Sequence, residues 1–249
     1  MTPMEAIEAR ISCRAYTDEP LNQGALDELR AYAEELTRGT NLRFVIVGPA
    51  EGGARLKLVK RMFTGKVSTY AALIGPDDNL TRERVGYLGE KLVLKATQMG
   101  LGSCWVAGTF DRKSVSEPLA AGEVLHDVIP LGYAPAKQPF AQRTIHASLR
   151  KRDRKPEALF QGPIPLVEAP AWIAAGIDAV IKGPSAVNEQ PVVFVWGDER
   201  LTATLPYGKR DLEYTDLGIA KLHFEIAAEA AGMDGAWEQG APAIFVPRG

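Results

Sequence analysis

Apolar residues recur along this chain at two spacings, which predict helices alternating with strands. In residues 24–38 the apolar side chains stand three or four positions apart, as on one face of a helix, and Gly39 supplies the stop. Helices are expected by the same reasoning over residues 4–9, 81–99, 168–183 and 216–231, with Asp216 as the N-cap of the last, and a basic helical segment over 54–61. Compact apolar runs predict strands over residues 42–48, 69–75, 128–134, 191–197 and 201–205.

This order of elements limits the fold class. Helices alternate with apolar strands and no hairpin signal stands out, which favours an α+β or α/β sandwich with a central sheet covered by helices. A loop-rich connection, residues 134–170, carries prolines and charges and separates two series of elements.

The two series are related to each other. Residues 85–108 reappear in altered form at 217–240 without a gap, each pair being 132 positions apart (for example 232 − 100). The landmarks Gly86, Ala96, Gly100, Trp105 and Gly108 fall on Gly218, Ala228, Gly232, Trp237 and Gly240. We therefore predict a duplication, with residues 1–156 and 157–249 as two halves packed as one unit. A duplicated chain can form inside one molecule the interface that unduplicated relatives form by dimerising.

Composition narrows the class of partner. The 249 residues are 46% hydrophobic and 24% charged, and 29 basic residues face 31 acidic ones, so neither nucleic acid nor an anionic membrane surface is an expected partner. Two cysteines and three histidines cannot build a spaced zinc site. The start of the chain has no apolar signal-peptide region and no run approaches a membrane span, so we expect a cytoplasmic protein.

The first candidate for chemistry is an alternating pattern near the N-terminus. Arg10, Ser12 and Arg14 would point the same way from an extended segment. Two guanidinium groups and a hydroxyl that converge suit a phosphate or another oxyanion, although such a pattern also occurs on a solvated edge.

Two further segments carry candidate groups. A basic run at residues 150–155, followed by Pro156, is either an exposed linker or a second anion contact. Residues 184–191, PSAVNEQP, are either a loop shaped by turn formers or a rigid loop that offers amide and hydroxyl groups to a polar heterocycle.

These elements, in this order, resemble the FMN-dependent nitroreductase family and, in particular, its duplicated branch. The resemblance spans nearly the whole chain and implies a nitroreductase-like α+β fold. It implies that Arg10, Ser12 and Arg14 bind the FMN phosphate and ring edge. It also implies phosphate contacts from Arg152 and Arg154, which precede Pro156.

The segment after the long helix resembles the family loop that lies against the flavin. The residues implied there are Trp105, Val106, Ala107 and Gly108, with the backbone N–H groups of Ala107 and Gly108 facing the flavin N5. Many relatives have a glutamate in place of Ala107, so the usual nicotinamide or substrate preference is in doubt. Lys66 corresponds to a basic residue near the ring. The flavin contacts implied from the second half are Pro184, Ser185 and Asn188.

The resemblance also implies an assembly. Ordinary members hold FMN at a homodimer interface, so the duplication implies a monomer that forms an intramolecular pseudo-dimer. The second half has no Arg-x-Ser-x-Arg before its helix, and the turn of the first half at residues 38–42 lacks the full Pro-Ser-x-x-Asn loop. We therefore expect one complete site and one eroded site.

The activity implied by the resemblance is that of an NAD(P)H-dependent oxidoreductase. It would reduce nitroaromatic, quinone or similar acceptors by alternating flavin reduction and reoxidation. Because the flavin carries this chemistry, no catalytic side chain is assigned. The alternative is a non-catalytic flavin-binding protein, or a degenerate one that keeps only the fold.

Overall fold

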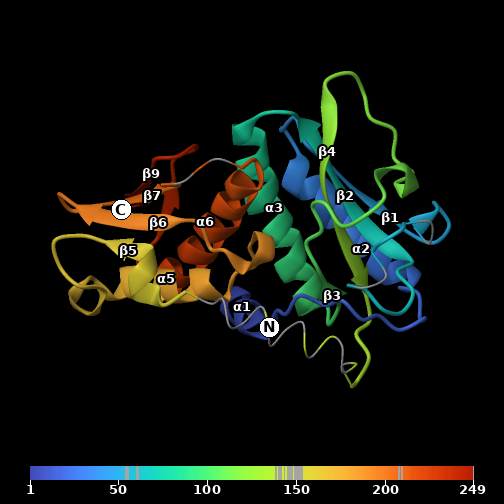
Figure 1. Cartoon of the computed structure of the whole chain (residues 1–249), viewed down its shortest axis with the longest axis horizontal. Helices are drawn as coiled ribbons and strands as arrows, with labels where there is room; N and C mark the ends of the chain where they lie inside the picture. The colour runs from blue at the N-terminus through green and yellow to red at the C-terminus, as the bar shows by residue number, and fades with distance from the viewer. Residues whose placement is uncertain are drawn as a thin grey trace. The chain divides into compact units, whose positions relative to one another are not determined.

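The computed structural model divides the chain into two compact units, each built from discontinuous segments (Figure 1). Unit 1 comprises Met1–Glu8, Asp78–Glu90 and Ser148–Gly249, and unit 2 comprises Ala9–Asp77 and Lys91–Ala147. The structure describes all residues except 54–55, 60–61, 138, 140–141, 143, 145–147, 149–153, 207, 209 and 249. The two halves expected from the repeat, 1–156 and 157–249, were derived from the repeat and not from compactness, and that division stays a prediction.

Unit 2 is a four-stranded antiparallel sheet with a helix packed on it. Its strands are β1 (Arg43–Val47), β2 (Thr69–Pro76), β3 (Gly102–Ser103) and β4 (Glu123–Gly132), in the order β1-β2-β4-β3. Helix α2 (Gln23–Thr37) begins after Asn22, whose Oδ1 accepts a hydrogen bond from the Ala25 N–H at 2.9 Å, and it packs against β1. A short 3-10 helix, Arg112–Ser114, lies between β3 and β4.

Unit 1 carries a five-stranded sheet in the order β5-β6-β7-β9-β8. Its strands are β5 (Phe160–Gln161), β6 (Val193–Gly197), β7 (Arg200–Thr204), β8 (Gly235–Trp237) and β9 (Ala243–Pro247). Its helices are α1 (Pro3–Ala9), α5 (Ala171–Lys182) and α6 (Leu212–Ala230), with 3-10 turns at Pro156–Leu159, Leu166–Glu168 and Ala186–Asn188. The helix α3 (Asn79–Gln98) begins in unit 1 and ends in unit 2.

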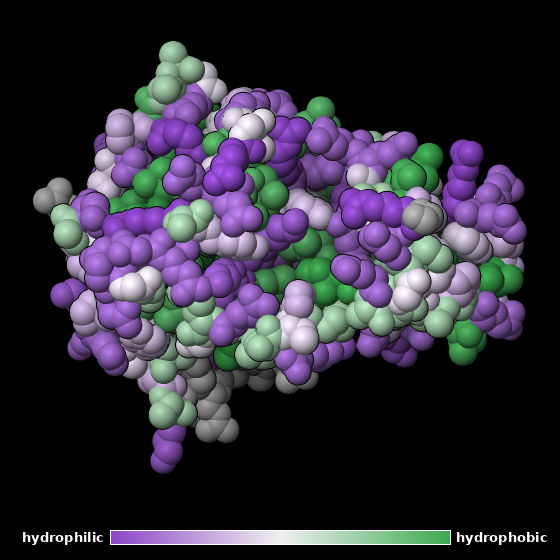
Figure 2. Space-filling model, turned by 180° about the vertical axis from the view of Figure 1, so that it is seen from behind, coloured by the Kyte–Doolittle hydropathy of each residue, from purple (hydrophilic) through white to green (hydrophobic). Residues whose placement is uncertain are grey.

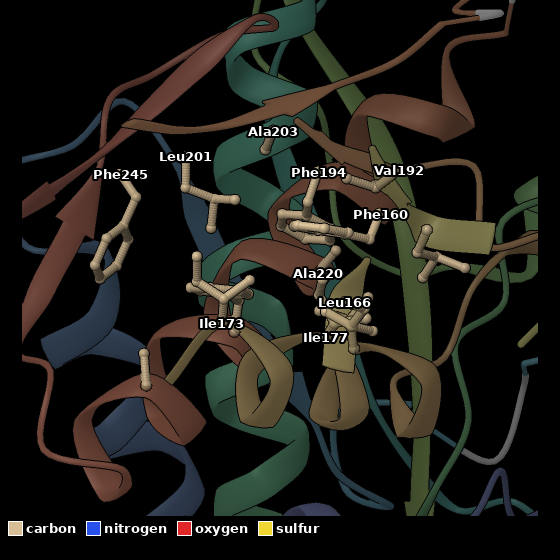
Figure 3. Packing of buried hydrophobic residues seen from close by; sticks show 14 of the residues in the cluster. Phe160, Leu166, Ile173, Ile177, Val192, Phe194, Leu201, Ala203, Ala220 and Phe245 are labelled. Atoms are coloured by element: carbon tan, nitrogen blue, oxygen red, sulfur yellow. The ribbon is translucent and has the colours of Figure 1, made fainter. Parts of the chain in front are cut away.

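The core of unit 1 is aromatic. Phe194 of β6 stacks on Phe224 of α6 with ring centroids 5.2 Å apart, and Trp172 of α5 stacks on Phe245 of β9 at 5.3 Å. Figure 3 shows the aliphatic side chains of the strands and of α5 pointing into the same cluster. Burial of these large rings stabilises this unit.

The order of strands repeats between the units. Strands β6-β7-β9-β8 follow one another in the sheet as β1-β2-β4-β3 do, and β5 is added in parallel at the β6 edge. The connections differ, because β6 joins β7 by a tight turn whereas β1 and β2 are separated by a long loop. The part added in the first half between its first two strands therefore includes the segment of Lys66.

The repeat is also visible where α3 meets α6 in unit 1. A Cβ on Gly86 would lie 2.0 Å from the carbonyl oxygen of Thr215, and a Cβ on Gly218 would lie 1.9 Å from that of Glu83. Gly86 and Gly218 are equivalent in the repeat, and so are Glu83 and Thr215. The contact is thus reciprocal, as in an isologous interface between two copies of one chain.

Several expectations are confirmed and others are wrong. The long helices and the apolar strands form where they were expected. Asp216 is not an N-cap, because α6 begins at Leu212 and Asp216 lies inside it. The prediction of a basic helical segment is wrong for residues 56–59. These residues are extended, and Leu58 forms a β-bridge with Phe110.

A hairpin was also overlooked. Strands β6 and β7 pair directly from Gly197 and Arg200, and the two turn residues, Asp198 and Glu199, have φ of 50° and 57°. This left-handed turn carries Asp and Glu instead of the usual Asn and Gly, so the sequence signal was weak. The short strands β3, β5, β8 and β9 escaped notice because so few residues show no periodicity.

On the face shown in Figure 2, hydrophilic side chains predominate and hydrophobic ones lie between them. None of the helices in the part of the chain that the structure describes has the length and apolar character needed to cross a membrane.

Candidate functional site

The Arg-x-Ser-x-Arg segment of unit 2 is extended and paired on both sides. Ser12 pairs in parallel with Ser103 of β3, and the Cys13 N–H donates to the Ser103 carbonyl at 2.7 Å. On the other side the Thr64 N–H donates to the Arg14 carbonyl at 2.9 Å, and Ala15 pairs with Thr64. The backbone of this segment is therefore fixed, and its alternate side chains are aimed by the pleat.

Arg10, Ser12 and Arg14 all influence the thiol of Cys104, Ser12 through a hydrogen bond and the two arginines through their charge. Burial raises the pKa of this thiol, and the charges of Arg14 and Arg10 together with a hydrogen bond from Ser12 oppose the rise. Cys104 itself is 3% exposed and reduced. The three groups thus form a donor set around a neutral sulfur.

The donor set has capacity left for a ligand. The Nη1 of Arg14 is buried and has no hydrogen-bond partner among the residues that the structure describes. A buried cationic donor without an acceptor is costly, and an oxyanion would satisfy it. The chemistry of this donor set fits the phosphate of FMN, whose binding here stays a prediction.

The predicted segment of Lys66 lies beside the Arg-x-Ser-x-Arg segment in unit 2. Gly65, directly before the exposed Lys66, has a φ of 81°, and a Cβ there would lie 1.8 Å from the carbonyl oxygen of Tyr16. Only glycine permits this approach, so the segment of Lys66 is held against the Arg-x-Ser-x-Arg strand.

The loop after β3 is attached to β4 through Val106. The N–H of Val106 donates to the Val128 carbonyl at 3.0 Å, and the N–H of Val128 donates back at 3.1 Å. Trp105 and Ala107 are half-buried and Gly108 is exposed, with nothing within 4 Å of the position of a Cβ. Gly108 therefore leaves room for a ligand beside its backbone.

The predicted residues of unit 1 lie in the loop that follows α5. Pro184, Ser185 and Asn188 belong to it, and Ser185 accepts a hydrogen bond on its Oγ from the Gln190 N–H at 3.0 Å. The loop also receives support from α6, because the Ala186 N–H donates to Asp216 at 3.0 Å.

Arg154 is attached to the same loop. Its N–H donates to the Oε1 of Gln190 at 2.9 Å, its Nη1 donates to the Gln190 carbonyl at 3.0 Å, and its Nη2 donates to the Ala158 carbonyl at 2.6 Å. Its predicted partner in the phosphate contact, Arg152, lies outside the described residues.

In the second copy of the repeat, the loop at Gly240 is hydrogen-bonded to a buried ion pair. Gly240, the counterpart of Gly108, donates its N–H to Glu83 at 2.7 Å. The ammonium of Lys221 contacts Glu83 at 2.5 Å and donates to the carbonyls of Glu238 and Gly240, both at 2.9 Å. Burial lowers the pKa of Lys221, and Glu83 opposes that shift. Side chains of the protein therefore already bond to the Gly240 N–H and to the carbonyls of Glu238 and Gly240 in this loop.

Sequence reasoning missed Cys104, Glu83, Lys221 and the part played by Asp216. Cys104 stands directly before Trp105 in the recognised loop, which was a usable signal. The other three are buried charged residues on helices, where the sequence gives no sign of the partner. Among the described residues no group of three or more His, Cys, Asp and Glu side chains could hold a metal ion.

Comparisons with known proteins agree with this architecture. A family model described as "Putative TM nitroreductase" matches residues 2–228. The crystal structure of a putative nitroreductase from Thermotoga maritima MSB8 superposes with a TM-score of 0.66 at 18% identity, over 99% of this chain and 93% of that one. At this identity the likeness shows the fold. No curated protein sequence matches the chain.

Two other structures align with about half of the chain. An FMN-dependent nitroreductase from Clostridium difficile R20291 has a TM-score of 0.43 at 18% identity, over 54% of this chain and 89% of that one. A nitroreductase with bound FMN from Bacteroides fragilis NCTC 9343 has a TM-score of 0.43 at 16% identity, over 55% and 91%. With a family model that covers nearly the whole length, the chain belongs to the nitroreductase family, a family of oxidoreductase enzymes.

Proposed function

We propose that this enzyme is an FMN-dependent oxidoreductase that takes electrons from NAD(P)H and passes them to nitroaromatic, quinone or similar acceptors. Membership of the family supports the reaction class. The observation that carries the FMN assignment is the buried Nη1 of Arg14, which lacks a hydrogen-bond partner among the described residues, in the extended segment that also holds Arg10 and Ser12 in unit 2. A bound flavin supplies the hydride and electron transfer chemistry itself.

The proposed roles of the residues are binding and orientation. The guanidinium groups of Arg10 and Arg14 and the hydroxyl of Ser12 would donate to the phosphate, since charge-assisted donors bind oxyanions most strongly. The neutral thiol of Cys104 adds no negative charge beside that anion. The exposed Gly108 would let backbone N–H groups approach the ring, and Lys66 would add positive charge near it.

We further propose that the chain binds one flavin. In the second copy of the repeat, the N–H of Gly240 is already donated to Glu83, and Lys221 occupies the carbonyls around it. In the first copy the counterpart of Lys221 is Gly89, which has no side chain to do this. These differences support an asymmetric pair of halves with a single open loop.

The test is a flavin titration followed by turnover. The purified protein should quench FMN fluorescence saturably, and with FMN bound it should oxidise NADH or NADPH when a nitroaromatic or a quinone is present. Arg38→Ala is the control, because it removes a positive charge from an exposed position of unit 2 that has no part in the proposed site. Absence of FMN binding, or binding without any oxidation of nicotinamide across a panel of acceptors, would reject the proposal.

A further inference from the structure

We infer that Arg154, Gln190 and Asp216 are positioning residues that hold the loop of residues 184–190 in its ligand-binding shape, and that Arg154 does this instead of binding phosphate. The inference rests on the proposed flavin binding. It assigns to Arg154 a different task from the one that its motif suggests.

The loop has a backbone conformation that it would not adopt by itself. Val187, Asn188 and Gln190 have φ of 47°, 57° and 47°. The left-handed region is unfavourable for any side chain and most of all for a β-branched one such as Val187. Such residues persist only where the surroundings determine the backbone, and they are concentrated at ligand clamps and switch regions.

In this loop, the residues that we infer to determine the backbone are Arg154, Gln190 and Asp216. Gln190 is 4% exposed, and each of its polar groups has a partner. Its N–H donates to Ser185, its Nε2 donates to the Ile181 carbonyl at 2.7 Å, and its two oxygens accept from Arg154. Gln190 therefore ties the end of the loop both to its beginning and to α5.

Asp216 supports the middle of the loop. It is 5% exposed on α6, and its two carboxylate oxygens lie 3.0 and 3.2 Å from the Ala186 N–H. This contact fixes the residue directly before the left-handed pair. With Gln190 it holds the loop at two points.

The guanidinium of Arg154 faces the chain itself. Both terminal nitrogens donate to backbone carbonyls, those of Gln190 and Ala158, and the backbone N–H of Arg154 adds a third bond to the Gln190 side chain. These bonds attach the guanidinium to the loop and to the turn that contains Ala158, and so fix its plane. An arginine that grips a phosphate would present its paired donors to the ligand.

The experiment compares FMN with riboflavin, which lacks the phosphate. Dissociation constants of both flavins are measured by fluorescence quenching for the wild type, Arg154→Ala, Arg154→Lys, Gln190→Ala and Arg14→Ala. We expect Arg154→Ala and Gln190→Ala to weaken both flavins by the same factor, roughly tenfold. Arg14→Ala should weaken FMN selectively. Arg248→Ala, an exposed change in the same unit, should alter neither.

The outcomes separate the inference from the function on which it rests. A loss for Arg154→Ala that is confined to FMN would make Arg154 a phosphate ligand and overturn the inference, and so would unchanged binding of both flavins. If circular dichroism shows that Arg154→Ala does not fold, the same comparison of FMN and riboflavin dissociation constants is made with Arg154→Lys. A wild type that binds neither flavin would instead reject the proposed function.

Discussion

At the scale of single residues, the site of unit 2 depends on how charge is arranged around a buried thiol. Arg10, Ser12 and Arg14 act on Cys104, whose pKa is nevertheless raised because burial outweighs the two guanidinium groups. The sulfur therefore stays uncharged at neutral pH and does not neutralise the charge of the arginines. A phosphate bound beside the arginines would therefore meet no negative charge from this thiol.

Substitution of Arg14 tests this arrangement. Arg14→Ala removes a buried charged donor, so we expect FMN binding to weaken by about 1.5–3 kcal/mol, the scale of a hydrogen bond to a charged group. Fluorescence titration measures the change, and Arg38→Ala should leave the dissociation constant as it is. An unchanged FMN affinity in Arg14→Ala would contradict the assignment.

Asp127 of β4 gives a prediction about pH. It is 3% exposed, and burial raises its pKa from 3.8 to about 7, while Arg112 opposes the rise. The folded state therefore holds a proton that the unfolded chain releases. The stability linked to this proton is present below about pH 4 and is lost as the pH rises through 7.

Asp127→Asn keeps the shape of the side chain and removes the titration. We expect its free energy of unfolding to exceed that of the wild type at pH 8, by up to about 4 kcal/mol, and the difference to vanish towards pH 4. Urea unfolding at the two pH values measures both quantities. A variant that is less stable than the wild type at pH 8 would show that the carboxylate is held by favourable contacts instead.

At the scale of elements, the crossing of α3 and α6 within unit 1 is tightly constrained. Gly86 and Gly218 let the two helix backbones approach until the position of a Cβ would overlap a carbonyl oxygen. The Lys221–Glu83 pair and the fully buried contact between His223 and Glu90, at 2.9 Å, lie along the same two helices. Close backbone packing and buried polar pairs together fix the register of the helices.

Gly86→Ala and Gly218→Ala should each destabilise the protein by roughly 2–4 kcal/mol, because the helices must separate to admit the methyl group. Thermal unfolding measures the loss. Gly24→Ala is the matched control, since Gly24 lies in α2 and its Cβ would meet only the Oδ1 of Asn22, at 3.4 Å. That change should be neutral or stabilising by up to about 1 kcal/mol. A loss in the control equal to that in Gly86→Ala would show that the destabilisation does not come from the close contact between the helices.

At the scale of the whole molecule, one chain contains two sheets with the same strand order and a reciprocal helix contact. A duplicated chain of this kind needs no second copy to supply the other half of a family dimer. We therefore expect a monomer that binds one FMN.

Light scattering combined with flavin quantification tests this expectation. The monomer should carry close to one FMN. Two FMN per chain would show that the loop around Gly240 opens in spite of Glu83 and Lys221. Flavin found only in a dimer would show that a single chain does not complete the site.

The sequence by itself determined much of this protein. Long apolar periodicities placed the major helices and strands, because a face buried over many residues repeats along the chain. The 132-residue offset revealed the duplication, and the ordered motifs identified the family. These features are local, or are copies of local features, and a linear sequence records them directly.

Only the tertiary structure decided which groups meet. Ser12 bonds to a cysteine that lies some ninety positions away in the chain, and Glu83 reaches Gly240 across a still larger separation. The motif of Arg154 suggests a phosphate ligand, yet its guanidinium holds the backbone of a loop. Contacts of this kind depend on packing between distant segments, which periodicity does not encode, and a charged residue takes its role from the partner that folding brings to it.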